Sequence, residues 1–177
     1  MDTTQTTLAL AEAVNTYFQG EKLEALIFIL PVGLLALVFG AWLLTDTPSA
    51  FARGVAIPLV LMGLVMTTVG AVVGYRTPAQ VAQLQAGLRN APETAVAAES
   101  VRMDKVNRAW KFYLVAWGLF GAAGLALRFA TRGDFGQGLG IALVLFAGVG
   151  LMVDGFAERR THPYTAALAA ARAGPGR

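Results

Sequence analysis

The fold is decided by residues 54–75, which read GVAIPLVLMGLVMTTVGAVVGY. This stretch carries no charged residue and has about the length of the ~20 helical residues that span a hydrocarbon core ~30 Å thick. Three further stretches are uncharged or nearly so, and we therefore expect transmembrane helices at residues 25–44, 54–75, 112–130 and 135–156. The sequence predicts an all-α, polytopic membrane protein.

The composition agrees with this expectation. Of the 177 residues, 56% are apolar and 14% are charged, whereas a soluble domain carries about a quarter charged residues. A cleaved secretory signal peptide is the alternative explanation of the first stretch, because Ala50 and Ala52 form a small-x-small pattern after it. The acidic segment of 24 residues before the stretch argues against cleavage.

The basic residues predict the orientation of the chain. If both ends are cytoplasmic, eleven basic residues lie inside, against Arg53, Arg128 and Arg132 at the two outer connections. The eleven are Lys22, Arg76, Arg89, Arg102, Lys105, Arg108, Lys111, Arg159, Arg160, Arg172 and Arg177. This bias follows the positive-inside rule, so we expect cytoplasmic N- and C-termini and a membrane of the bacterial inner-membrane type.

The expected architecture is a four-helix transmembrane bundle of two tandem hairpins, because both outer connections are short. The remaining segments are assigned to the cytoplasm: an N-terminal helix at 1–24, a helical connection at 76–111 and a C-terminal tail at 157–177. Helix boundaries are expected at Gly20, at Thr77 and Pro78, between Asn90 and Pro92, and at His162 and Pro163.

The chain also resembles itself. A shift of 84 residues aligns residues 57–86 with 141–170, and eleven of these thirty positions are identical, where composition alone would give roughly three or four. We interpret this as an internal repeat. Because each copy has two spans, the copies would point the same way and be related by an axis along the membrane normal.

Asp154 is the most informative polar residue, since a carboxylate in a span is costly without a partner. Lys111 lies at the same distance from the second outer connection, and we therefore expect a buried ion pair between Lys111 and Asp154. A proton or cation relay is the alternative role for Asp154. The many glycines of the spans are expected to let helices approach closely within the bundle rather than at a dimer interface.

The cytoplasmic helices carry apolar stripes that predict packing or binding. Val81, Leu84 and Leu88 form one stripe, and Val96, Met103 and Val106 form another. Leu84 and Met103 are the candidate contacts to a partner, unless the two stripes pack on each other. Arg159 and Arg160, just beyond the last span, are candidate contacts to anionic lipid head groups.

The residue inventory favours binding over catalysis. The chain has no cysteine and one histidine, so we expect no enzymatic activity, no metal and no cofactor. The basic residues are explained by orientation, and no nucleic-acid partner is expected. The sequence predicts a small membrane protein that binds another membrane component by helix–helix contact, as a subunit, assembly factor or immunity-type protein, or that self-associates. A small oligomeric transporter or channel is the alternative.

Overall fold

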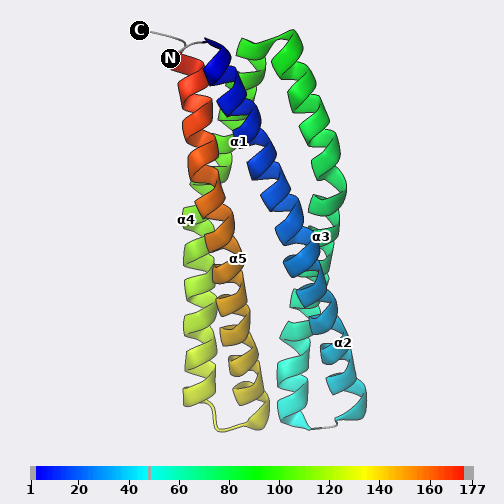
Figure 1. The fold of residues 1–177 in the computed structure, drawn as a ribbon. Helices are drawn as coiled ribbons and strands as arrows, with labels where there is room; N and C mark the ends of the chain where they lie inside the picture. Colours follow the sequence, from blue (N-terminus) through cyan, green and yellow to red (C-terminus); the bar gives the residue numbers. More distant parts are fainter. Residues whose placement is uncertain (1–2, 48, 174–177) are drawn as a thin grey trace.

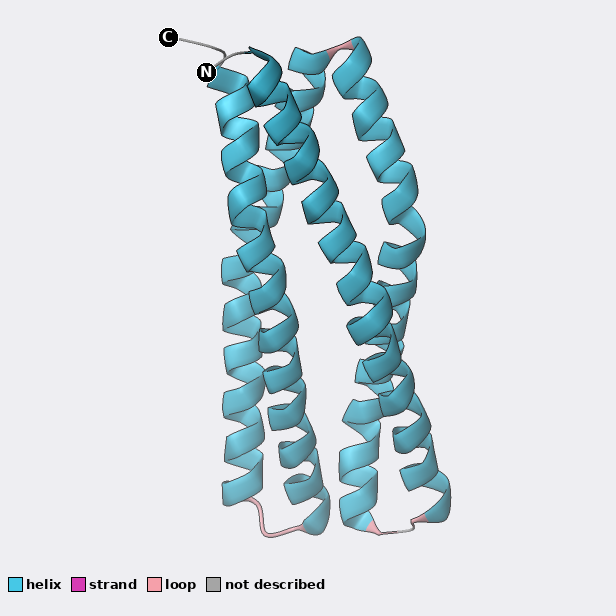
Figure 2. Ribbon diagram, viewed as in Figure 1, coloured by secondary structure: helices cyan, strands magenta, loops and turns pink. Residues whose placement is uncertain are grey.

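The computed structural model describes residues 3–47 and 49–173, and side chains from Leu8 onward. The helices are α1 (Thr3–Leu23), the π-helical segment η1 (Glu24–Ile29), α2 (Leu30–Asp46), α3 (Ala50–Asn90), α4 (Pro92–Ala130) and α5 (Asp134–Ala173) (Figures 1 and 2). The described residues contain no strand. Four helices are long and apolar enough to cross a membrane, which confirms the all-α class and the four apolar helices.

Three expected helix boundaries are wrong. The helix does not end at Gly20, and α3 and α5 run without a break through Pro78 and Pro163. Thr77, the expected start of a new helix, and Thr161, which precedes the expected start at His162, are both buried. Each hydroxyl donates to a backbone carbonyl of the preceding turn. A proline removes one backbone donor, and packing on both sides of it keeps the helix continuous. The expected boundary between Asn90 and Pro92 is confirmed.

The apolar helices are arranged side by side in an open bundle. Helix α4 packs along α5, α5 packs on α3, and α3 packs along α2. Figure 1 shows the two antiparallel pairs, α2 with α3 and α4 with α5, each closed by a short connection at the lower end of the view. Within the described residues, α2 has no extensive contact with α4 or α5. Helix α4 therefore forms one edge of the bundle.

Corresponding helices of the two pairs have ends 84 residues apart. Asp46 and Ala130 end α2 and α4, and Ala50 and Asp134 begin α3 and α5. The contacts within the pairs also correspond. A Cβ atom on Gly40 would meet Val60, and one on Gly124 would meet Val144, in both cases at 2.9 Å from the side chain. These correspondences support the repeat, which stays a prediction about the origin of the chain.

The crossing of α3 and α5 has the same 84-residue relation. Gly54 of α3 lies against the backbone of Phe135, and Gly138 of α5 lies against the backbone of Phe51. Position 54 corresponds to 138 and position 51 to 135, so the contact is reciprocal. A reciprocal contact is the mark of a two-fold relation. These reciprocal contacts are the ones expected of a pseudo-two-fold axis through this glycine crossing.

The opposite end of the molecule is a helical head, which we define as residues 3–23, 77–90, 92–110 and 158–173. Its core contains side chains from α1, α4 and α5, with α3 packed at its margin. The core residues are Leu10, Val14, Tyr17, Phe18, Val96, Met103, Tyr164 and Leu168. Residues 1, 2 and 174–177, which the sequence assigned to the N-terminal helix and the C-terminal tail, lie outside the described residues.

Candidate functional site

Glu99 is the centre of a buried polar network in the head. Glu99 is only 8% exposed, and its carboxylate accepts two hydrogen bonds from Arg102, at 2.6 and 2.9 Å. The hydroxyl of Tyr164 donates a third, at 2.8 Å. A two-pronged arginine and a phenol are a strong donor set for a carboxylate. The network therefore joins α4 to α5 through a charge that would be costly to bury alone.

Aromatic rings complete this network. Tyr17 of α1 stacks on Tyr164 with ring centroids 4.6 Å apart, and the Arg102 guanidinium lies 5.5 Å from the ring centroid of Phe18. Burial, followed by the nearby charge of Glu99, raises the pKa of Tyr164 above its ordinary value. Burial also raises the pKa of Tyr17. Both phenols hold their protons more tightly than exposed tyrosines do, and that of Tyr164 is donated to Glu99.

The structure places Leu84 and Met103, the candidate partner contacts, against the head core. Met103 has no exposed surface, and Leu84 is half-buried against the same cluster. The two apolar stripes therefore pack on each other within the head, which is the alternative to contact with a partner. A partner would have to open the head to reach Met103.

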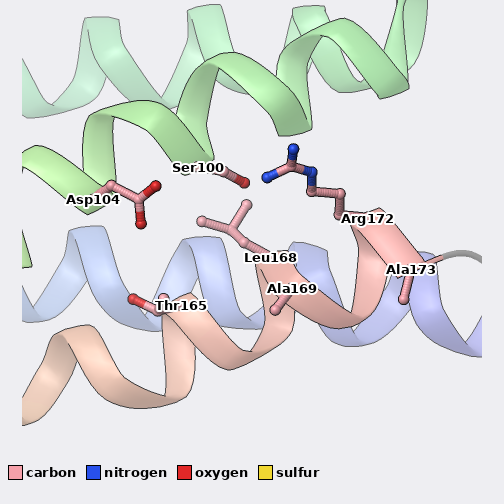
Figure 3. A pocket seen from close by; sticks show the side chains of 7 residues that line it. All are labelled: Ser100, Asp104, Thr165, Leu168, Ala169, Arg172 and Ala173. Atoms are coloured by element: carbon pink, nitrogen blue, oxygen red, sulfur yellow. The ribbon is translucent and has the colours of Figure 1, made fainter.

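A groove of about 320 Å³ lies on the outside of the head between α4 and α5 (Figure 3). Ser100 and Asp104 of α4 face Thr165, Leu168 and Arg172 of α5 across it. Asn107, one turn after Asp104 in α4, donates a hydrogen bond to the hydroxyl of Thr165, at 3.3 Å. Within the described residues, no group of three or more histidine or acidic residues is placed to hold a metal ion.

The expected ion pair between Lys111 and Asp154 is not among the three ion pairs that the described residues form. Lys111 is exposed, and Asp154 accepts a hydrogen bond from the indole nitrogen of Trp117. Helical side chains lean toward the N-terminus of their helix, so in antiparallel α4 and α5 those of Lys111 and Asp154 lean apart. Trp117, one to two turns deeper in α4, leans toward Asp154.

Arg159 and Arg160 have different surroundings. Arg160 of α5 forms an ion pair with Glu24 of η1, and the two side chains are 24% and 11% exposed. Gly20 makes room for this contact, because a Cβ atom there would lie 2.6 Å from Cδ of Arg160. Arg159 is exposed and takes part in none of the three ion pairs of the described residues.

Three glycines form an open stripe on the α4–α5 pair. Gly118, Gly148 and Gly155 are the helical glycines of the described chain at which an added Cβ would meet no atom within 4 Å. Gly118 follows Trp117 and Gly148 follows Ala147, both of which face the opposite helix. Each step along a helix rotates the side-chain direction by about 100°. Because the two helices are antiparallel, the residue that follows an inward-facing residue points to the same side of the pair in both. Gly155 lies two turns beyond Gly148 on that side.

These features define an all-helical protein with four apolar helices of membrane length, an ion-paired helical head and an open glycine stripe. No protein-family model matches the chain, and the comparisons with curated proteins and with solved structures also find no match.

Proposed function

We propose that this chain is an integral membrane protein with four spans and cytoplasmic termini, which binds a membrane-spanning helix of another protein through the α4–α5 pair. The exposure of α4 supports insertion: only 6% of its most apolar stretch is buried within the protein, against 39% in α3. Phe112, Leu114, Val115 and Leu119 are among the exposed side chains. So much contiguous apolar surface requires lipid or a partner.

The orientation is supported by the charge bias and by the fold. The described ends of the chain, Thr3 and Ala173, lie at the head, on the opposite side from the two short connections (Figure 1). Single cysteines at Ser49 and Ser100 test this topology, because the chain has no native cysteine. A membrane-impermeant reagent added to intact cells should label only the first. Labelling of Ser100→Cys would show that the chain has the opposite orientation.

The open glycine stripe is the observation that carries the binding role. Most glycines of these helices pack against a neighbour, whereas Gly118, Gly148 and Gly155 face open space. The corresponding positions of the first pair are Leu34, Leu64 and Ala71, all exposed. Two leucines therefore cover this face on α2 and α3, where α4 and α5 have glycines with no side chain. Small residues at such positions let another helix approach closely.

Gly118→Leu and Gly148→Leu test this role, since leucine fits the open space without disturbing the fold. In mild detergent, the wild-type chain should retain a specific membrane protein, identified by mass spectrometry, that both variants lose. Leu64→Phe, which adds bulk at the corresponding site of the first pair, should retain it. Loss with all three variants, or with none, would refute the stripe as the binding surface.

Two other outcomes would assign the stripe differently. If the retained protein is a second copy of this chain, crosslinked dimers should disappear in Gly148→Leu, and the role becomes self-association. The transporter alternative rests on Asp154, a carboxylate within an apolar helix. A saturable solute flux through reconstituted wild-type protein that is absent in Asp154→Asn would favour that alternative.

A further inference from the structure

An open groove of about 610 Å³ lies where η1 meets α5, at the boundary between the apolar helices and the head. Phe28 and Phe156 form its apolar part, and both belong to segments expected to span the membrane. Glu24, Arg159 and Arg160 form its polar part, one turn closer to the head. The groove therefore changes from apolar to charged along the direction in which a lipid changes from acyl chain to head group.

The charges of the groove favour an anion. Its lining includes two arginines and one glutamate, which leaves a net charge of +1. Arg160 is held by Glu24, so the exposed guanidinium of Arg159 is the cation left to meet a ligand. Arginine binds phosphate oxygens through paired N–H donors.

Two buried polar atoms of the Arg160–Glu24 pair have no hydrogen-bond partner. Nε of Arg160 lacks an acceptor, and Oε1 of Glu24 lacks a donor. Both atoms are closed to solvent in this structure, so a phosphodiester oxygen reaches the first and a hydroxyl group the second only when the two side chains shift. Unsatisfied buried polar groups are uncommon in folded proteins, and a ligand that supplies both partners removes their cost.

We propose that this groove binds one anionic glycerophospholipid with a hydroxyl-bearing head group, its phosphate at Arg159 and an acyl chain over Phe28 and Phe156. Phosphatidylglycerol is the simplest lipid with this chemistry. The proposal rests on the proposed insertion of the chain into a membrane, since only there does the groove lie at head-group depth.

Binding is measured by native mass spectrometry of the full-length protein in detergent, with added phosphatidylglycerol or phosphatidylcholine. Phosphatidylglycerol should bind more tightly, and Arg159→Gln should weaken its binding about fivefold, from ~1 kcal/mol per interfacial arginine. Arg172→Gln makes the same charge change on an exposed site of α5 outside the groove and should leave binding unchanged. Phe156→Ser should also weaken binding, because it removes the surface for the acyl chain.

Several results would overturn the proposal. Equal losses in Arg159→Gln and Arg172→Gln would show general electrostatic attraction, and equal binding of the two lipids would remove the anion selectivity. Competition by millimolar inorganic phosphate would assign the site to a free anion. Circular dichroism checks that each variant is folded. Alkaline extraction of membranes separates the two proposals: wild-type protein that is extracted contradicts insertion itself, whereas retained protein with unaltered lipid binding in Arg159→Gln contradicts only the lipid site.

Discussion

The two helix pairs place different residues at the same corresponding positions. In the first pair, Gly33 of α2 packs on the backbone of α3, and Gly70 of α3 packs on Leu30. The positions 84 residues later are Trp117 and Asp154, which are joined by a hydrogen bond. At these two positions the first pair has glycines that meet the facing helix, whereas the second pair has an indole ring that lies against Gly150 and a carboxylate that the ring hydrogen-bonds.

This difference can be set against the contacts that the two pairs share. The glycines at positions 40 and 54 correspond to glycines at 124 and 138, because these sites bring backbone against backbone. Elsewhere the two pairs differ: the second contains the carboxylate of Asp154 and the open glycine stripe. A functional surface is expected where the copies differ, since the shared contacts are needed to build each pair.

The largest expected effect comes from breaking the crossing that relates the two pairs. Gly54→Leu and Gly138→Leu should each destabilise the protein by more than ~4 kcal/mol, because either side chain would drive into the backbone of the facing helix. The yield of monodisperse, helical protein in detergent measures this effect. Gly118→Leu is the control and should fold normally. If only one of the two crossing variants fails to fold, the pseudo-two-fold relation does not hold.

The next effect compares corresponding arginines. Arg160→Gln should cost about 3 kcal/mol, because it leaves the mostly buried carboxylate of Glu24 without its charged partner. Arg76 occupies the corresponding position in α3 and pairs with Glu21 at 3.3 Å, but its side chain is 46% exposed. Arg76→Gln should therefore cost less than ~1 kcal/mol. Unfolding in a denaturing-detergent titration followed by circular dichroism measures both, and equal costs would contradict the assigned burial.

A smaller effect is expected from the polar contact that only the second pair has. Trp117→Phe should cost about 2 kcal/mol by removing the donor to Asp154. Lys111→Ala should change stability by less than ~0.5 kcal/mol, since that side chain is exposed. The same titration measures both changes. A coupling free energy between Lys111→Ala and Asp154→Asn in a double-mutant cycle would instead establish the ion pair expected from the sequence.

The smallest effect is a loss of stability at alkaline pH. The pKa of Tyr164 is raised above 10.0, so its phenol in the unfolded chain ionises first as the pH rises through 10. The folded state keeps its proton there, and the unfolded state is favoured increasingly above pH 10. The slope of unfolding free energy against pH should be smaller in Tyr164→Phe, where the contribution of Tyr17 remains. An unchanged slope would contradict a role for Tyr164 in this loss.

Several features could be predicted from the sequence because they depend on nearby residues. The apolar helices follow from long runs without charge, and the break between Asn90 and Pro92 follows from local helix signals. The continuity of α3 and α5 through Pro78 and Pro163 could not be predicted in this way. It depends on the tertiary packing of Thr77 and Thr161, which the local proline signal does not report.

The polar contacts were harder to predict because they join distant residues. Glu99 does interrupt the apolar stripe between Val96 and Met103, and this position indicates a buried charge. Its donor Tyr164 lies 65 residues away, and no spacing rule selects that residue. For Asp154, equal depth in a hairpin is an insufficient criterion for a partner. The lean of side chains toward the N-terminus decides which neighbour it reaches.

The π-helical segment η1 limits how long the chain can be between the head and the first apolar helix. It joins α1 to α2 in one continuous helix, and its wider turns set the rotation of the head helix relative to the first apolar helix. A π-helical segment already accommodates one residue more than an α-helix of the same rotation, so inserting a further residue between Glu24 and Ile29 would turn α1 by about 100° against α2. Tyr17 would then leave Tyr164, and Glu24 would leave Arg160. The contacts of the head therefore limit how far this stretch of chain can lengthen.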